Sequence, residues 1–235
     1  MGAITRITVI AVCFVLSACS GGGGGGDSAS APPPAPPTTS PTTQFSIAGA
    51  FGAFWQSTHN YTLTATDAQN NSYTAQLSMT PGPNGTFRGQ ATNTSSSSVI
   101  LKKNGATVSA STGTDYFLSS PYSFVGTANS DGSCDVGRDQ HALPSYATVG
   151  QSGAFYASDG QPGCGVFRTS STTVVWSLSA DSPTTAWFCL VSSWVSTVVA
   201  SYTETGTECY KVDQAGNVSA ITLAVTVGGE TLTFR

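Results

Sequence analysis

The fold is decided by the stretch Tyr61-Thr-Leu-Thr-Ala-Thr66, Asp67-Ala-Gln-Asn-Asn71 and Tyr73-Thr-Ala-Gln-Leu-Ser-Met-Thr80. In the first and last of these runs, an apolar or aromatic side chain alternates with Thr, Gln or Ser. A period of two predicts strands with one buried face and one solvated face, which is typical of antiparallel sheets. The residues between the two runs are turn formers, so the stretch predicts a β-hairpin.

The same pattern returns near the C-terminus. Apolar residues occupy alternate positions from Ile221 to Val227, and turn-forming residues lie on both sides of this run. We therefore expect three strands, near 208–213, 218–227 and 230–234, joined as a meander.

No stretch shows the 3.6-residue apolar period of an amphipathic helix, and β-branched residues dominate the periodic segments. The sequence therefore predicts an all-β fold for residues 44–235, either an antiparallel β-sandwich or a barrel-like sheet. This length suits one such unit or two small subdomains. The turn residues at 128–132 mark where a seam between two subdomains would fall.

The N-terminus has the composition of an export signal. Residues 1–6 carry one positive charge, and the apolar run that follows ends in Leu16-Ser-Ala-Cys19. A charged segment followed by an apolar run and small residues is typical of a secretory signal. The apolar run is about half of the ~20 residues that a membrane-spanning helix requires.

Leu16–Cys19 resembles the lipobox of bacterial lipoproteins. The resemblance implies that residues 1–18 are a signal peptide and that the thiol and amine of Cys19 carry lipid such as palmitate. Ser20 is similar to the residue found after the cysteine in outer-membrane lipoproteins of Gram-negative bacteria. The implied location is the outer membrane, with the protein held there by its N-terminal lipid. The resemblance does not decide between the periplasmic and the outer face.

Residues 19–43 predict a tether. Six glycines at 21–26 are followed by a run of prolines, serines and threonines. This segment has almost no apolar side chains to bury, so we expect it to be disordered. Glycines make a flexible coil and prolines a stiffer, extended spacer. The poly-Gly stretch after the cysteine is similar to the tethers of many Gram-negative lipoproteins.

Composition limits the partners of the protein. Only 9% of the residues are charged, and the formal net charge is −4, which becomes about −5 when Arg6 leaves with the signal peptide. Nucleic-acid binding requires a basic footprint, so we expect no nucleic-acid partner. Electrostatic attachment to anionic lipids is disfavoured for the same reason.

The chain contains six cysteines, of which Cys13 belongs to the signal peptide and Cys19 to the lipobox. The remaining four are Cys134, Cys164, Cys189 and Cys209. An even number of cysteines in an exported protein predicts two disulfides, for which three connectivities are possible. We favour Cys134–Cys164 with Cys189–Cys209, because each of these pairs closes a local loop. No Cys-x-x-Cys pair indicates a zinc site.

Catalytic patterns are weak. Asp139 and His141 lie close in sequence, and Gly150-Gln-Ser-Gly-Ala154 contains a candidate nucleophile, Ser152. Ala154 replaces the last glycine of the Gly-x-Ser-x-Gly elbow. The segment also resembles the Gly-x-Ser-Gly of chymotrypsin-like proteases, but Gln151 stands where that family has Asp. We interpret the segment as a turn and predict no catalytic site.

One acidic cluster has oxygen ligands of the kind that calcium prefers: Asn129, Asp131, Asp135 and Asp139. Its spacing is not that of an EF-hand loop, and the Asp-Gly pair within it is typical of a turn. We therefore predict no metal and no cofactor. We expect His59 to lie at a solvated strand end.

Four tryptophans could line a sugar-binding face or fill the core, and we favour the core for a chain with few charges. They are Trp55, Trp176, Trp187 and Trp194. The leading hypothesis is a lipid-anchored, noncatalytic β domain that binds a protein or glycan at the cell envelope. A structural or assembly role in the outer envelope is the first alternative. An envelope hydrolase using Ser152, His141 and Asp139 is the second.

Overall fold

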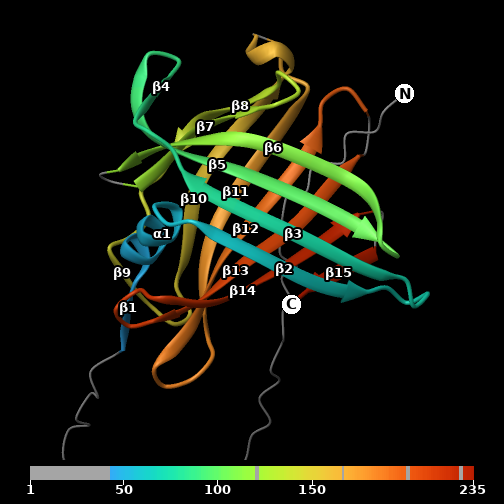
Figure 1. The fold of residues 1–235 in the computed structure, drawn as a ribbon. Helices are drawn as coiled ribbons and strands as arrows, with labels where there is room; N and C mark the ends of the chain where they lie inside the picture. Colours follow the sequence, from blue (N-terminus) through green and yellow to red (C-terminus); the bar gives the residue numbers. More distant parts are fainter. Residues whose placement is uncertain (1–42, 120–121, 166, 200–201, 228–229) are drawn as a thin grey trace, which may run out of the picture. The chain divides into compact units, whose positions relative to one another are not determined.

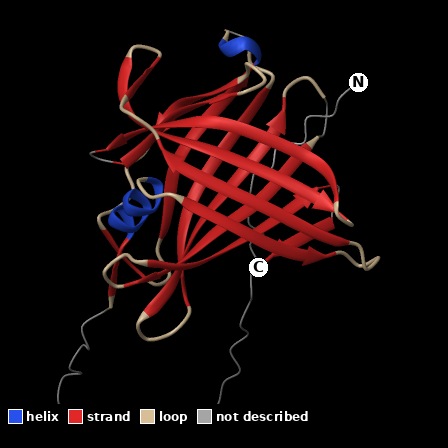
Figure 2. Cartoon of the chain, viewed as in Figure 1, coloured by secondary structure: helices blue, strands red, loops and turns tan. Residues whose placement is uncertain are grey.

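The computed structural model describes residues 43–119, 122–165, 167–199, 202–227 and 230–235. The predicted signal peptide, Cys19 and the tether up to residue 42 lie outside the described residues. Strands make up most of the described chain, with two short helices, α1 (Ile47–Trp55) and η1 (Pro162–Cys164) (Figure 2). Within the described residues, no helix is both long enough and apolar enough to cross a membrane.

The strands form one large antiparallel sheet that curls into a barrel-like arrangement (Figure 1). Each strand pairs with the next in the order β2 (His59–Thr66), β3 (Ser72–Pro81), β5 (Gln90–Lys103), β6 (Ala106–Ser119), β7 (Tyr122–Asn129), β8 (Cys134–Gln140), β10 (Ser152–Gln161), β11 (Ser170–Ala180), β12 (Thr185–Ser196), β13 (Thr203–Asp213), β14 (Val218–Val227) and β15 (Glu230–Phe234). Strand β4 (Gly85–Phe87) pairs with β5 outside this path, and β1 (Gln44–Ser46) pairs with β9 (Tyr146–Thr148).

The first and last strands of the large sheet meet and nearly close it. The Thr64 N–H donates to the Arg235 carbonyl at 2.9 Å, and the Arg235 N–H donates to the Thr64 carbonyl at 3.1 Å. The predicted all-β fold is therefore confirmed in its barrel-like form. Residues 128–132 cover the end of β7 and the start of its connection to β8, and these two strands are neighbours in the same sheet. The C-terminal meander is formed by β13, β14 and β15, as predicted.

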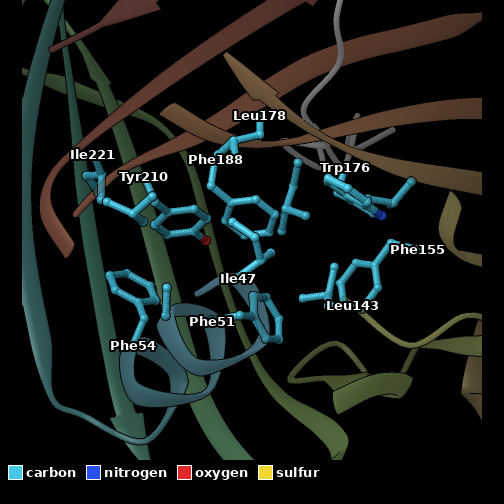
Figure 3. Packing of buried hydrophobic residues seen from close by; sticks show 14 of the residues in the cluster. Ile47, Phe51, Phe54, Leu143, Phe155, Trp176, Leu178, Phe188, Tyr210 and Ile221 are labelled. Carbon is cyan, nitrogen blue, oxygen red and sulfur yellow. The ribbon is translucent and has the colours of Figure 1, made fainter. Parts of the chain in front are cut away.

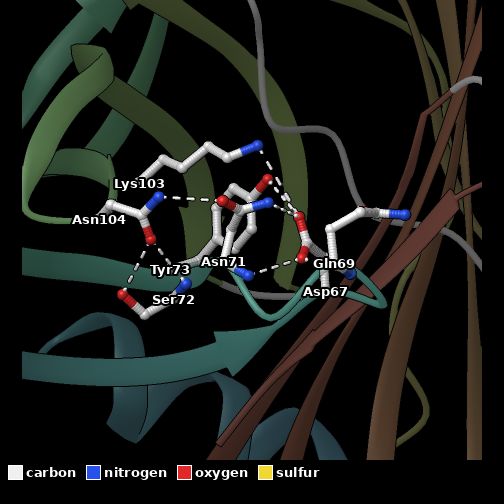
Figure 4. A network of polar contacts seen from close by, with 7 residues as sticks. All are labelled: Asp67, Gln69, Asn71, Ser72, Tyr73, Lys103 and Asn104. Carbon is white, nitrogen blue, oxygen red and sulfur yellow. Dashed lines mark hydrogen bonds and ion pairs between the residues drawn. The ribbon is translucent and has the colours of Figure 1, made fainter.

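The predicted hairpin at residues 61–80 is formed by β2 and β3, and Asp67 organises its turn (Figure 4). The Asn71 N–H donates to Asp67 Oδ1 at 2.8 Å, and the Asn71 Nδ2 donates to Asp67 Oδ2 at 2.8 Å. The Tyr73 hydroxyl also donates to Oδ2, at 3.1 Å. Asp213 receives the same two bonds from Asn217 in the turn between β13 and β14. Two similar sequences therefore build the same turn.

Helix α1 was not expected from the sequence. Its buried residues Ile47, Ala50, Phe51 and Phe54 lie at the i, i+3, i+4 and i+7 spacing of one helix face, so the sequence does carry a short helical period here that the prediction overlooked. This face packs against the core of the curled sheet, where Ile47, Phe51 and Phe54 are at most 4% exposed (Figure 3), whereas the opposite face of the helix is exposed. The Phe51 ring meets the ring of Phe155 edge-on at a centroid distance of 5.3 Å. Burial of these side chains, rather than helix propensity, stabilises α1.

Candidate functional site

A cavity of about 250 Å³ lies inside the sheet, beside helix α1. Aromatic side chains, small hydroxyl residues and carboxyl groups line it together. Its lining includes Phe51, Trp55, Asp115, Phe117, Phe124, Thr127, Asp135, Phe155, Tyr156, Ser158, Thr172, Val174, Leu190, Ser192, Trp194 and Glu208. The cavity thus has the mixture of apolar walls and a few polar groups that is typical of small-molecule sites.

Three carboxyl groups from separate parts of the chain reach this cavity: Asp115 on β6, Asp135 on β8 and Glu208 on β13. The Asp115 side chain is held by two hydroxyl groups. The Thr127 hydroxyl donates to its Oδ1 at 2.6 Å, and the Ser97 hydroxyl donates to its Oδ2 at 2.9 Å. Asp115 is only 9% exposed, so its carboxyl is oriented inside the protein rather than in solvent.

Burial dominates the electrostatics of these acids. It raises the pKa of Asp115 to about 6, although the hydrogen bonds from Thr127 and Ser97 act in the opposite direction. The negative charge of Asp135 contributes a further increase. Burial also raises the pKa of Glu208, and the charge of Asp115 adds to it. The pKa of Tyr156 is raised for the same two reasons. The negative form of each group is therefore costly in this cavity.

The aromatic walls are closely packed. The rings of Phe124 and Tyr156 stack at a centroid distance of 4.1 Å, and the Trp55 ring lies 4.8 Å from Phe117. The indole nitrogens of Trp55 and Trp194 are buried but have no hydrogen-bond partner among the described residues. A buried N–H without a partner is costly, so both groups are available to an acceptor in the cavity.

A second cavity, of about 170 Å³, lies next to the first. The two share Trp55 and Glu208 in their linings. Most of the second lining is apolar, with contributions from Leu77, Met79 and Val99 on β3 and β5. The interior therefore has an acidic, aromatic compartment next to an apolar one.

The three hydrolase candidates from the sequence make separate contacts in the structure. Ser152 begins β10, and the His141 backbone N–H donates to the carbonyl of Phe155 on the same strand at 2.8 Å. Asp139 makes an ion pair with Arg138, at 3.9 Å between Oδ2 and Nε. Among these described residues, the contacts of His141 and Asp139 are thus with Phe155 and Arg138 rather than with Ser152.

The acidic cluster at 129–139 is split by the fold. Asp131 Oδ1 accepts hydrogen bonds from the Ser133 N–H at 2.9 Å and from the Ser133 hydroxyl at 2.6 Å, which makes a turn of the predicted kind. Asp135 instead faces the interior cavity. Within the described part of the chain, no group of three or more His, Cys, Asp or Glu residues is arranged to hold a metal ion.

The four cysteines of the β domain lie in two pairs at disulfide distance. The Cα atoms of Cys134 and Cys164 are 4.8 Å apart, and those of Cys189 and Cys209 are 4.0 Å apart. This is the local pairing that the sequence favoured. The second pair links neighbouring strands β12 and β13, where the two cysteines lie directly opposite each other.

The tryptophans divide between three environments. Trp176 is a core residue, 7% exposed, as predicted. Trp187 lies on the outer face of β12, where its indole N–H donates to Asp181 at 3.1 Å. Trp55 and Trp194 line the acidic cavity. The prediction that all four favour the core is therefore correct for Trp176 and wrong for Trp187.

His59 lies at a strand end, as predicted, because it begins β2, but the prediction that it is solvated is wrong. Its ring is half-buried and stacks on the Phe54 ring at 4.2 Å, and its Nε2 donates to the Phe54 carbonyl at 2.9 Å. His59 therefore connects the end of α1 to the start of β2. Sequence reasoning missed α1, and without the helix no partner for His59 was visible.

Comparisons with protein families, with curated proteins and with solved structures found no match to this chain. The site must therefore be interpreted from its own chemistry. Sequence reasoning singled out Asp135 only as a calcium candidate and did not find Asp115, Tyr156 or Glu208. The sequence does show that Asp115 and Glu208 lie in strands of mostly apolar and small residues. It does not show that these strands bring the two acids to the same cavity.

Proposed function

We propose that this chain is a lipid-anchored protein of the cell envelope whose β domain binds a small molecule inside the barrel-like sheet and catalyses no reaction. The observation that carries the proposal is the interior cavity, with carboxyl groups and aromatic rings brought together from distant parts of the chain. A core built only for stability would place apolar side chains there, because burial of ionisable groups is unfavourable.

The proposed anchor is the lipid on Cys19, and residues 20–43 are the proposed tether that holds the β domain away from the membrane surface. The resemblance of Leu16–Cys19 to a lipobox supports this part of the proposal. Two cysteine pairs at disulfide distance support an oxidising compartment such as the periplasm or the cell surface. The proposed location is the outer membrane of a Gram-negative cell.

Binding rather than catalysis is favoured by the position of the hydrolase candidates. Ser152 is exposed at the start of β10 and is not part of the cavity lining, and neither are His141 and Asp139. The groups that do converge in the cavity are held by packing and hydrogen bonds, as in a preformed binding site.

The test of binding uses the purified full chain and three probes of similar size, each with one phenyl ring and a different charge. These are 2-phenylethylammonium, neutral 2-phenylethanol and the anion phenylacetate. We expect at least one probe to raise the thermal unfolding temperature of the protein. Ser158→Leu, which adds volume inside the cavity, should reduce that effect. Ser152→Leu is the matched control on the same strand, because this side chain is exposed.

Circular dichroism spectra establish that both variants retain the sheet. If none of the three probes changes the unfolding temperature, or if Ser158→Leu and Ser152→Leu respond alike, binding inside the sheet is refuted. Ser152→Leu also removes the candidate nucleophile, so a loss of esterase or peptidase activity in this variant would favour the hydrolase alternative.

A further inference from the structure

We propose that the ligand of the interior cavity is a small organic cation, with an ammonium group bound among Asp115, Glu208 and the aromatic rings and an apolar body in the adjoining compartment. This inference rests on the proposed function, since it names the class of molecule that the cavity binds. Its support comes from the charge distribution, the aromatic lining, the unpartnered donors and the shape of the two compartments.

The described basic side chains lie away from the two acids Asp115 and Glu208. They are Arg88, Lys102, Lys103, Arg138, Arg168, Lys211 and Arg235. None of them belongs to the lining of either interior cavity. Asp159 pairs with Arg138 at 3.7 Å and Asp181 with Lys211 at 2.8 Å, so two outer acids have cationic partners. The interior acids Asp115 and Glu208 have none of these seven side chains beside them.

Burial is the main reason why ionisation of these acids is unfavourable, and the repulsion between neighbouring carboxylates adds to it. Asp115 and Glu208 each experience a neighbouring carboxylate and no described cation, and burial raises both of their pKa values. A bound cation would favour the ionised form of each and remove their mutual repulsion. A bound anion would have the opposite effect. The electrostatics of the cavity therefore select positive charge.

The aromatic lining distinguishes an organic cation from a metal ion. Ring faces attract ammonium groups, and the attraction is strongest where water is excluded. Phe117, Phe124, Tyr156 and Trp194 all border the same space as Asp115. A hard metal ion would instead require several converging oxygen ligands. No group of three or more such ligands is arranged for a metal within the described part of the chain.

The unpartnered donors and the second compartment indicate which other groups the ligand carries. The buried indole N–H groups of Trp55 and Trp194 can donate to an oxygen acceptor on the ligand or to water carried with it. Beyond Trp55 and Glu208, the lining becomes apolar through Leu77 and Met79. The ammonium group and the apolar body would thus occupy different compartments, with Trp55 between them.

The experiment is calorimetric titration of the full chain with 2-phenylethylammonium, 2-phenylethanol and phenylacetate at pH 7.5. We expect the ammonium probe to bind at least tenfold more tightly than the neutral alcohol, and phenylacetate to bind least. The double variant Asp115→Asn, Glu208→Gln should bind the ammonium probe at least tenfold more weakly than the wild type does. Its affinity for the alcohol should stay within about threefold of the wild-type value. Asp139→Asn is the control for removal of an exposed carboxylate.

If the alcohol binds as tightly as the ammonium probe, or if the double variant retains full affinity for the cation, the inference is overturned while interior binding stands. If no probe binds, both the inference and the proposed function fail. If the double variant does not fold, Glu208→Gln alone replaces it. This variant should also lose at least tenfold in affinity for the ammonium probe and keep its affinity for the alcohol. Unfolding curves for every variant establish that it is folded at the temperature of the titration.

Discussion

Asp115→Asn should make the protein more stable at neutral pH and should remove part of its pH dependence. The side chain lies in the interior cavity, where Asp135 and Glu208 from two other strands also face it and Tyr156 lies nearby. Asparagine has almost the same shape. Its amide oxygen can accept from Thr127, and the Ser97 hydroxyl can rotate to accept from its amide nitrogen. The substitution therefore removes the charge without leaving a polar group unpaired.

The magnitude follows from the pKa of Asp115. Burial raises this pKa from the ordinary value of 3.8 to about 6. Between these values the folded protein retains a proton that the unfolded chain releases, so the free energy of unfolding falls as pH rises. The stability that this retained proton contributes is fully present below the pKa of the unfolded chain, 3.8, and is lost once pH exceeds the pKa of the folded protein, about 6. The complete loss is about 3 kcal/mol, of which about 2 kcal/mol falls between pH 4.5 and 7.

Urea unfolding of the wild type and of Asp115→Asn at pH 4.5 and at pH 7 measures this effect. The difference in unfolding free energy between variant and wild type should increase by about 2 kcal/mol from the lower to the higher pH. Asp139→Asn, at a side chain that is 69% exposed, controls for the change in net charge. A difference for Asp115→Asn that stays constant between the two pH values, or that decreases, would refute the assignment of a raised pKa to this residue.

Three further predictions concern other parts of the chain. Cys19→Ala should abolish lipid attachment and membrane partition of the full chain, and continued partition with full lipid mass would contradict the proposed anchor. Non-reducing peptide mapping should recover Cys134–Cys164 and Cys189–Cys209, and replacing both cysteines of one pair by Ser should reduce stability by about 3 kcal/mol in urea unfolding. Partial burial raises the pKa of Asp67, but the hydrogen bonds that its carboxylate accepts have a larger opposite effect, so the pKa is lowered overall. Asp67→Ala should therefore lower the unfolding temperature at pH 7 more than at pH 3. An equal decrease at both pH values would show that the charge of Asp67 is not involved.

The hairpin at residues 61–80 was predictable because its signals are local. The alternation along each strand and the Asp67–Asn71 turn lie within twenty residues, and the hydrogen bonds of the turn connect residues four apart. Helix α1 was not predictable in the same way. Its buried face follows the helical period over only nine residues that include two glycines, and it is stabilised by contacts with strands that follow much later in the chain, such as Phe155 on β10.

The cavity was hidden from sequence reasoning for a related reason. Asp115 lies on β6 and Glu208 on β13, and these strands come together only because the sheet curls and nearly closes through Thr64 and Arg235. Strand alternation predicts that such residues share a face with their apolar neighbours two positions away. It does not predict which residues meet across the interior, because that depends on the register of every strand between them.

The placement of the acids argues that the interior is more than a structural core. The chain contains twelve Asp and Glu residues, and three of them face one cavity although exposed strand positions are abundant. A hydrophobic residue at position 115 would avoid the cost that its raised pKa records, and the two hydroxyl groups that hold Asp115 would then not be needed. Local features that reduce stability without a structural gain are typical of functional sites. If Asp115→Asn is more stable at pH 7 and also loses affinity for 2-phenylethylammonium, the same carboxyl group that weakens the fold is the group that binds the cation.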